Sequence, residues 1–344
     1  MKLIKTNQIG LFFNGLLLDL AVPANLSYSR CIGSSLALCL VVQLTTGILL
    51  AERYVGDIEL AFSTIDHIMR DVFYGWLLRY LHALTASLFL TLTYLHIGRG
   101  LYYGSYIPPR QTLWFSGFVI FICLMATAFL GYTLPFGSMS LRGAVVITNL
   151  LSALPVIGTE LVNWIWGGFS VSSPTLTRFY AFHYLLPFVI ASLTLVHLIL
   201  LHENGSNNPL GLGASKIKFS PYLWFKDIVY WLFMAIVISF FLFYEPDYWG
   251  HPDNFNSADP LVTPSSIVPE FYFLPYYAIL RAIPNKLGGV VAMVSAIVIL
   301  LTISRTSTKK PKSSKWKSLQ GFLFWSFTAN FIFLGWLGNH PASE

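Results

Sequence analysis

Two pairs of histidines lie inside long apolar stretches of the chain: His82 with His96, and His183 with His197. Both pairs have the same separation, since 96 − 82 and 197 − 183 are each 14. Fourteen residues of α-helix make about four turns and about 21 Å of axial rise, so the two histidines of a pair share one helix face. Because a bilayer core is about 30 Å thick, each pair would place one histidine in each half of a membrane.

A single histidine in an apolar helix is as often a packed or hydrogen-bonded residue as a ligand. Two pairs with one spacing are harder to explain as packing, because ionisable side chains inside a bilayer are costly and usually functional. Neutral imidazole is also a common ligand of metals and of haem. The spacing therefore predicts two bis-histidine haems, one above the other across a membrane.

The composition agrees with a membrane location, because 55% of the 344 residues are hydrophobic and only 10% are charged. Long apolar runs are typical of transmembrane helices. We predict an all-α integral membrane protein with seven transmembrane helices, the first four forming a dihaem four-helix bundle. The seven expected spans are 31–51, 77–98, 113–135, 180–201, 224–244, 287–304 and 319–338.

Two domains are expected along this chain. Residues 1–210 would form the bundle domain, and its segment 138–168, too broken by Asn149 and Pro155 to span, would lie at the surface as a helical hairpin. Residues 211–344 would form a three-helix domain, in which the long connection 245–286 carries the sequence Pro-Glu-Phe-Tyr.

The basic residues predict the orientation, since loops on the negative side of a membrane carry an excess of lysine and arginine. With the N-terminus on that side, its loops hold 14 of the 21 basic residues and only three acids, Asp19, Glu203 and Asp227. The C-terminus would then lie on the opposite side. The 14 are Lys2, Lys5, Arg30, Arg99, Arg110, Lys216, Lys218, Lys226, Arg305, Lys309, Lys310, Lys312, Lys315 and Lys317.

Glycines repeat the histidine interval on the first and third spans: Gly33 with Gly47, and Gly117 with Gly131, each 14 residues apart. Glycine lets a flat ligand approach the backbone closely. Small-residue helix packing would explain any one of them, but four repeats of one interval favour a bundle that clamps two macrocycles. Gly47 and Gly131 would flank the haem at the level of His82. Gly33 and Gly117 would flank the other haem.

Three arginines and one tryptophan are further candidates for cofactor binding. Arg79 lies one turn before His82, and Arg99 one turn after the second histidine of that pair. Cations there would suit haem propionates, at even odds with ordinary arginines that reach the membrane surface. Arg178 has a similar position before the fourth span, and Trp114 lies at the start of the third.

The three cysteines lie in apolar stretches, and the sequence has no C-x-x-C-H motif. Haem attached through thioether bonds is therefore not expected. Any haem would be held without covalent links.

Several longer motifs make the chain resemble mitochondrial cytochrome b, the dihaem core of ubiquinol–cytochrome c oxidoreductase (respiratory complex III). The resemblance covers about residues 1–340 and rests on Gly131-Tyr132-Thr133-Leu134-Pro135, Gly143-Ala144 with Val146-Ile147-Thr148-Asn149-Leu150-Leu151-Ser152, His202-Glu203 with Gly205-Ser206-Asn207-Asn208-Pro209, and Pro269-Glu270-Phe271-Tyr272 with Ala278-Ile279-Leu280-Arg281.

The resemblance implies haem b(L) on His82 and His183, and haem b(H) on His96 and His197. It also implies an outer quinol-oxidation site and an inner quinone-reduction site. At the outer site a carboxylate takes a proton from the bound quinol. The residues that match this site are Glu270, Tyr132, Tyr277, Gly143 and Phe129; those that match the inner site are His202, Ser206, Asp227 and Lys226.

The resemblance further implies ubiquinol and ubiquinone as substrates and a Q cycle that moves protons across the mitochondrial inner membrane. The N-terminus would lie on the matrix side and the C-terminus on the intermembrane-space side. Partners would be the Rieske iron–sulfur protein, a c-type cytochrome, other complex III subunits, membrane lipid and a second copy in a dimer, with no nucleic acid.

The chain departs from the family pattern at three places. Phe271 stands where the family usually has tryptophan in Pro-Glu-Trp-Tyr, and Arg142 stands where it usually has tryptophan before Gly143. The family usually has eight spans, and the sequence stops after Asn339-His340-Pro341, so the last helix is expected to be missing.

Two rival functions fit the sequence less well. A plastoquinol-type cytochrome b would be split after four spans, would have one more residue between the fourth-span histidines, and would read Pro-Asp-Trp-Tyr; the unsplit chain, the interval of 14 and Glu270 disfavour it. A haem-free transporter with a histidine proton relay is disfavoured because no inverted internal repeat is apparent.

Overall fold

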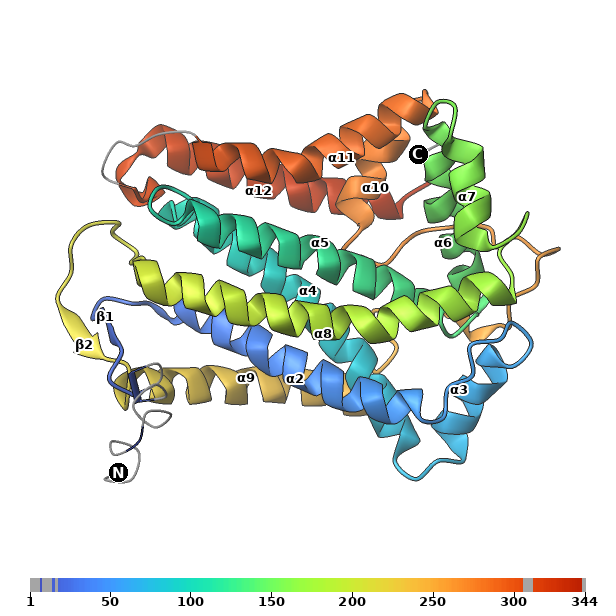
Figure 1. Ribbon diagram of the computed structural model, residues 1–344, viewed down its shortest axis with the longest axis horizontal. Helices are drawn as coiled ribbons and strands as arrows, with labels where there is room; N and C mark the ends of the chain where they lie inside the picture. Colours follow the sequence, from blue (N-terminus) through green and yellow to red (C-terminus); the bar gives the residue numbers. More distant parts are fainter. Residues whose placement is uncertain (1–6, 8–13, 16–17, 306–311, 342–344) are drawn as a thin grey trace.

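The computed structural model is a bundle of long, roughly parallel and antiparallel helices (Figure 1), and it describes residues 7, 14–15, 18–305 and 312–341. Six described helices are at least 18 residues long and apolar enough to cross a membrane. The chain is therefore a membrane protein, as predicted. The six are α2 (Cys31–Ala51), α4 (Gly75–Tyr103), α5 (Gln111–Thr133), α8 (Ser173–Asn204), α9 (Tyr222–Tyr244) and α12 (Ser318–Asn339).

The first four of these form the predicted bundle, with α2 packed along α4 and α5 packed along α8. Their shared core lies halfway between the histidines of each pair. One buried aliphatic residue comes from each helix: Leu40, Leu90, Leu124 and Ile190. Leu40 and Leu124 lie midway between the two glycines of their helices, and Ile190 midway between His183 and His197. An apolar layer thus separates two levels of the bundle.

The sixth predicted span, 287–304, forms a helix that is shorter than the other six. Helix α11 (Lys286–Thr302) has 17 residues and continues into the 3₁₀ turn η5 (Ile303–Arg305). It packs beside α10 (Leu274–Ala282), which in turn packs along α12.

Helices α4 and α8 are longer than their predicted spans, because their polar ends also form helix. Before α8, the backbone N–H of Ser172 donates to Oγ1 of Thr175 at 3.1 Å, and Pro174 occupies the first turn. Both features favour the start of a helix. The helix therefore begins at Ser173, seven residues before the expected span.

One end of the bundle, called here the α7 end, carries the short helices α3 (Ala61–Arg70), α6 (Ser138–Asn149) and α7 (Gly158–Trp166), with the 3₁₀ turn η3 (Leu150–Ala153) between the last two (Figure 1). The long connection after α9, which includes η4 (Pro252–Phe255), is tied to the start of α6. A β-bridge joins Gly137 to Ser257, and Ser140 donates its N–H to Oδ1 of Asn254 at 2.9 Å.

The opposite end, called here the β1 end, carries a two-stranded antiparallel sheet of β1 (Ala21–Pro23) and β2 (Lys216–Lys218). The 3₁₀ turns η2 (Tyr28–Arg30) and η6 (Ser314–Trp316) precede α2 and α12 there. These strands add a small element that the all-α prediction did not contain. Lys2, Lys5, Lys309 and Lys310, which were counted for the orientation, lie outside the described residues.

Candidate functional site

The four histidines form two levels in the bundle, as their spacing predicts. His82 and His183 face each other at the level nearer the α7 end, with ring centroids 6.2 Å apart. His96 and His197 face each other at the other level, with centroids 6.4 Å apart. Two metal–imidazole bonds of about 2 Å, plus about 1 Å from each ring nitrogen to its centroid, add to about 6 Å. Each histidine pair therefore fits one iron between its rings.

The glycines lie against the histidines in the predicted combination. A methyl group built on Gly47 would be 3.1 Å from Cε1 of His82, and one on Gly131 would be 2.5 Å from Cε1 of His183. At the other level, Gly33 faces His96 at 3.4 Å and Gly117 faces His197 at 3.1 Å. The glycines thus leave space for the imidazoles and for a flat group between them. Any larger residue at these positions would occupy that space.

Hydrogen bonds at Nδ1 orient three of the imidazoles. Thr46 Oγ1 lies 2.9 Å from Nδ1 of His82, and it already donates to the carbonyl of Val42 at 2.7 Å. Since the hydroxyl proton is used, this oxygen accepts from Nδ1–H. Nε2 of His82 is then the unprotonated nitrogen, which is the atom that can bind a metal.

The same arrangement recurs at the other two rings. Ser116 Oγ donates to the carbonyl of Leu113 at 2.8 Å and lies 2.8 Å from Nδ1 of His197. Nδ1 of His183 lies 2.9 Å from the carbonyl of Thr127, which can only accept. Such partners are typical of metal-bound histidines, because they select the tautomer and raise the basicity of the ligand.

His96 differs from the other three. Its Nδ1 is buried and has no hydrogen-bond partner among the described residues. The residue before its glycine, Gly33, is Ile32, which has no hydroxyl group. By contrast, a hydroxyl residue precedes each of the glycines that face His82 and His197.

A large cavity surrounds the level of His82 and His183 and extends to the α7 end. Arg79 lines it, as do Gly47, Gly131 and Glu270. A cation there is placed to meet an anionic group held near these histidines, which is what the sequence suggested for Arg79. Its guanidinium also lies over the ring of Tyr80, 5.3 Å from the centroid.

Glu270 stands between this cavity and a second one at the α7 end. Glu270, Tyr132 and His251 line both cavities. Burial raises the pKa of the Glu270 carboxyl to about 7, against the opposing effect of the positive charge of Arg79. A carboxyl with a pKa near neutrality can both take up and release a proton at physiological pH.

The other residues predicted for the outer site lie around Glu270 to different extents. A methyl group on Gly143 would be 3.7 Å from the ring of Tyr132, so these two are neighbours. Tyr277 donates its hydroxyl to the carbonyl of Ile267 at 3.1 Å, which holds the turn that carries Glu270. Phe129 packs against Phe179 instead, with ring centroids 5.9 Å apart.

The two substitutions among the three departures from the family pattern both have contacts in the structure. The Arg142 guanidinium donates to the carbonyls of Pro260 at 3.1 Å and Val262 at 2.6 Å, so it ties α6 to the long connection. Phe271 stacks near Trp249, with ring centroids 6.2 Å apart.

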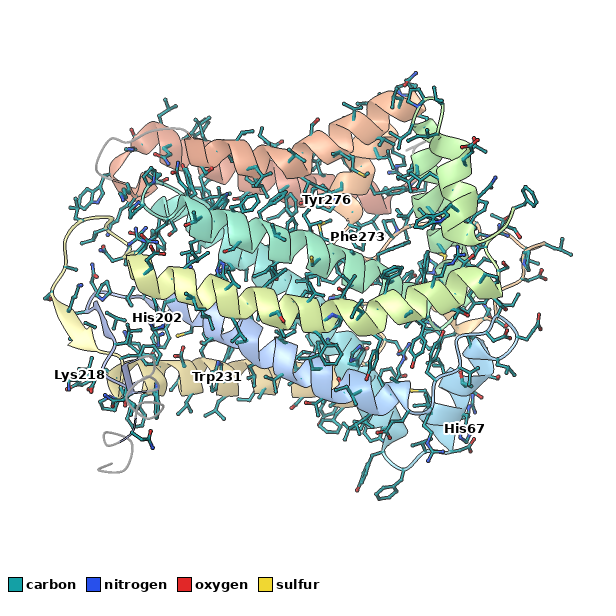
Figure 2. All side chains as sticks on the ribbon, in the orientation of Figure 1. His67, His202, Lys218, Trp231, Phe273 and Tyr276 are labelled. Carbon is teal, nitrogen blue, oxygen red and sulfur yellow. The ribbon has the colours of Figure 1, made fainter. Side chains whose placement is uncertain are left out.

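At the β1 end, Asp227 is held by residues of the first span and the turn before it. Its carboxylate forms an ion pair with Arg30 at 3.1 Å and accepts a hydrogen bond from Ser34 at 2.7 Å. Lys226 instead donates to the carbonyl of Leu26 at 3.1 Å. His202 lies at the same end of the molecule, near the C-terminus of α8 (Figure 2).

Ser206 follows directly after α8, in a segment that is bound to the neighbouring loops. Arg110 donates to the carbonyl of Gly205 at 3.0 Å, and Asn207 donates to that of Tyr103 at 2.9 Å. Among the described contacts, neither His202 nor Ser206 makes a hydrogen bond to Asp227.

Comparison with known proteins identifies the family of the chain that carries the two histidine levels. A family model described as "Cytochrome b/b6/petB" matches residues 17–205, and one described as "Cytochrome b(C-terminal)/b6/petD" matches residues 257–344. The chain belongs to the cytochrome b family. Membership of this family implies that it binds b-type haem, and the histidine levels are where the described structure offers facing ligands.

Relatives in this cytochrome b family come from distant organisms. A cytochrome b of Spizellomyces punctatus is 53% identical over 346 residues, which cover 100% of this chain and 87% of that one. A cytochrome b of Rickettsia bellii (strain RML369-C) is 52% identical over 326 residues, covering 94% and 82%. Among solved structures, a chain described as "Hyperthermophilic respiratory Complex III" is similar with a TM-score of 0.93 and 30% identity, covering 99% of this chain and 91% of that one.

The remaining candidates for cofactor binding are Arg99, Arg178 and Trp114, and each donates a hydrogen bond to a backbone carbonyl. The Arg99 guanidinium reaches the carbonyl of Ser29 at 3.5 Å, near the start of α2. Arg178 is exposed and donates to the carbonyls of Trp164 and Ile165 at the end of α7. Trp114 donates its indole N–H to the carbonyl of Leu300 at 2.7 Å. These contacts favour structural roles for Arg178 and Trp114 in this cytochrome b.

Sequence reasoning missed the residues that orient the imidazoles. Thr46 and Ser116 each come directly before a glycine that faces a histidine. A hydroxyl residue before a glycine, on two helices and at the predicted levels, was therefore the signal that could have identified them.

Proposed function

We propose that the chain is the dihaem cytochrome b subunit of ubiquinol–cytochrome c oxidoreductase, the respiratory complex III, and that it works by a Q cycle. The observation that carries the proposal is the geometry of the two histidine levels, each with facing imidazoles and matching glycines. His82 and His183 would hold haem b(L), and His96 and His197 haem b(H). Bound haem supplies one-electron transfer, and the protein supplies binding and orientation.

At the outer site, the residues of this chain bind ubiquinol and take up its proton. The ring would lie in the cavity beside Tyr132, whose own ring neighbours Gly143, and a quinol hydroxyl would donate one proton to the Glu270 carboxylate. The carboxyl faces two cavities, so a proton taken from the first can leave through the second. Of the two electrons, one would leave together with the quinol's second proton to an iron–sulfur partner, and the other would cross the bundle.

At the inner site, ubiquinone would accept electrons at the β1 end. Protons would reach its carbonyl oxygens from His202 and Asp227, with Ser206 and Lys226 at the edge of the site. This arrangement takes protons up on one side of the membrane and releases them on the other, which is how the protein would contribute to proton translocation.

The partners follow from the same proposal. The Rieske iron–sulfur protein would dock at the α7 end, where Val156, Phe169 and Leu261 are each more than 90% exposed. A c-type cytochrome, further subunits and a second copy of the complex would complete the assembly in the mitochondrial inner membrane. The excess of basic residues at the β1 end supports a matrix-side N-terminus, with the C-terminus in the intermembrane space.

The rival functions fit less well. A haem-free transporter would not need glycines against all four imidazoles, nor a hydrogen-bond partner at Nδ1 of three of them. A plastoquinol-type protein is disfavoured by Glu270, because that type has aspartate in the corresponding loop.

The test is turnover of the purified complex with decylubiquinol and cytochrome c. We expect quinol-dependent reduction of cytochrome c with release of protons, lost in a His82→Ala variant. Absence of quinol-dependent reduction in a complex that holds both haems would overturn the proposal.

A further inference from the structure

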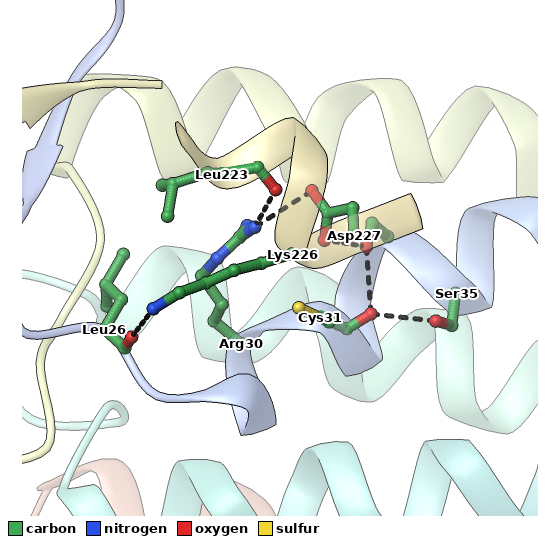
Figure 3. A network of polar contacts seen from close by, with 8 residues as sticks. Leu26, Arg30, Cys31, Ser35, Leu223, Lys226 and Asp227 are labelled. Atoms are coloured by element: carbon green, nitrogen blue, oxygen red, sulfur yellow. Dashed lines mark hydrogen bonds and ion pairs between the residues drawn. The ribbon is translucent and has the colours of Figure 1, made fainter. Parts of the chain in front are cut away.

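A buried ion pair joins the residue that precedes α2 to the second turn of α9 (Figure 3). Nη2 of Arg30 lies 3.1 Å from Oδ2 of Asp227, and the two side chains are only 13% and 6% exposed. The same Nη2 donates to the carbonyl of Leu223 at 2.5 Å. The guanidinium is therefore fixed to α9 at two points.

Residues of α2 hold the second carboxylate oxygen as well. Ser34 Oγ donates to Oδ1 of Asp227 at 2.7 Å. Arg30 and Ser34 are four residues apart, so they lie one above the other on one helix face. With both oxygens engaged from α2, the Asp227 carboxylate has one orientation, which neither contact alone would fix.

The adjacent lysine does not take part in this arrangement. Lys226 Nζ donates to the carbonyl of Leu26 at 3.1 Å and lies over the ring of Tyr28, 5.6 Å from its centroid. Figure 3 shows the Lys226 side chain extending away from Asp227 toward Leu26, whereas the Arg30 guanidinium points toward Asp227. Among the described contacts, Arg30 is thus the cation that meets this carboxylate.

The ion pair lies next to a haem-binding level. Ser34 directly follows Gly33, which faces the His96 imidazole. The Asp227 carboxylate bonded to Ser34 is therefore beside the level at which the inner quinone site is proposed. A buried Arg–Asp pair costs desolvation and is by itself weak evidence for stability, so its place beside this level favours a functional reason.

We propose that Arg30 is a positioning residue of the inner quinone site: together with Ser34 it fixes the Asp227 carboxylate as a hydrogen-bond acceptor for the ring hydroxyl of a bound quinol. This inference rests on the proposed function. Once Asp227 has passed its proton to the quinone, its ionised carboxylate only accepts hydrogen bonds. The fixed carboxylate then binds the hydroxyl of the quinol product rather than the carbonyl of a quinone. Removing the guanidinium should weaken quinol binding more than quinone binding.

The test uses the intact purified complex, with its iron–sulfur and c-type centres reduced beforehand by ascorbate. The outer site then has no electron acceptor, and decylubiquinol can reduce the b haems only through the inner site. We expect Arg30→Gln to raise the KM for decylubiquinol about tenfold, with a smaller change in the KM for decylubiquinone in the forward direction. Arg30→Lys should recover part of the loss, because it keeps the charge without the planar fork.

Two further variants distinguish a loss of Asp227 positioning from a nonspecific effect on the structure of the complex. Ser34→Ala frees only Oδ1 and should raise the same KM by a smaller factor. Lys218→Gln removes an exposed cation that pairs with Asp19 on the same end of the molecule, and it should change neither KM. Haem content from the oxidised spectrum normalises each variant. If Arg30→Gln fails to assemble, Arg30→Lys and Ser34→Ala decide the question by the same criterion.

The outcomes distinguish this inference from the function on which it rests. If the wild-type complex shows no haem reduction by decylubiquinol under these conditions, the inner site itself is wrong. If the wild type reacts but Arg30→Gln and Ser34→Ala keep the wild-type KM for decylubiquinol, only the positioning role of Arg30 is overturned.

Discussion

Gly131 packs directly against the imidazole of His183: a methyl group at this glycine would lie 2.5 Å from Cε1 of the ring, the closest approach among the four glycine–histidine contacts. The other three distances are 3.1, 3.1 and 3.4 Å. Contacts under about 3 Å cannot be relieved without moving the ring, whereas 3.4 Å needs only a small adjustment. The four glycines should therefore differ in how far they tolerate alanine.

Replacing Gly131 by alanine should displace His183 and reduce binding of the haem at that level. Overpacking in a filled site typically costs about 1–3 kcal/mol, and here the ring that moves is the ligand. We expect Gly131→Ala to lose most of one haem per protein in the purified complex, and Gly33→Ala to lose little. Gly213→Ala has no atom within 4 Å of its added methyl group and serves as the control. Equal haem content in all three variants would contradict the claim that these glycines leave the space that the histidines and haem need.

Removing the acceptor at Nδ1 should shift the potential of one haem and leave the other unchanged. Thr46→Val keeps the shape of the side chain but removes the oxygen that accepts from His82. A less basic imidazole stabilises the oxidised iron less, so the midpoint of haem b(L) should rise by tens of millivolts, about 59 mV being a tenfold change for one electron. Ser116→Ala should act in the same direction on haem b(H). A shifted midpoint potential of the same haem in both variants would refute the assignment of His82 and His197 to different haems.

Quinol oxidation should depend on pH through Glu270. Only the carboxylate form can accept a proton, and burial raises the pKa of this carboxyl to about 7. The rate should therefore rise as the pH increases through about 7 and level off above it. Glu270→Gln should lower the rate about tenfold or more and remove this rise. A Glu270→Gln complex with the wild-type pH profile would show that another group takes the proton.

The interval of 14 residues was enough to predict the two histidine levels because periodicity within one helix is local. His82 and His96, and likewise the two glycines of α2, share a face whatever surrounds the helix. Burial of Leu40 and Ile190 midway between these positions follows from the same periodicity. The spans could be predicted for a similar reason, since apolar length decides which segments can cross a membrane.

Contacts between distant segments could not be predicted in this way. Thr46 meets a histidine 36 residues away, and Ser116 meets one 81 residues away. The ion pair joins Arg30 to Asp227, which is 197 residues away (227 − 30). Such pairs depend on how helices rotate against each other, which helical periodicity alone leaves open.

Arg142 should hold the long connection onto α6. It donates to the carbonyls of Pro260 and Val262, and a hydrogen bond from a charged group contributes about 1.5–3 kcal/mol. In Arg142→Ala the segment around Pro260 should exchange its amide hydrogens about tenfold faster or more, as read by hydrogen–deuterium exchange. Arg70→Ala, which removes an exposed arginine paired with Asp66 one turn away, should leave that segment unchanged. Unaltered exchange in Arg142→Ala would contradict this role.

The central claim, one haem at each histidine level, is tested most directly by an optical redox titration of the complex. The wild type should show two b-type transitions with separate midpoints. His183→Ala should remove the b(L) transition and leave b(H) largely intact, and His197→Ala should do the reverse. A single transition in the wild type, or loss of neither haem in these variants, would contradict the claim.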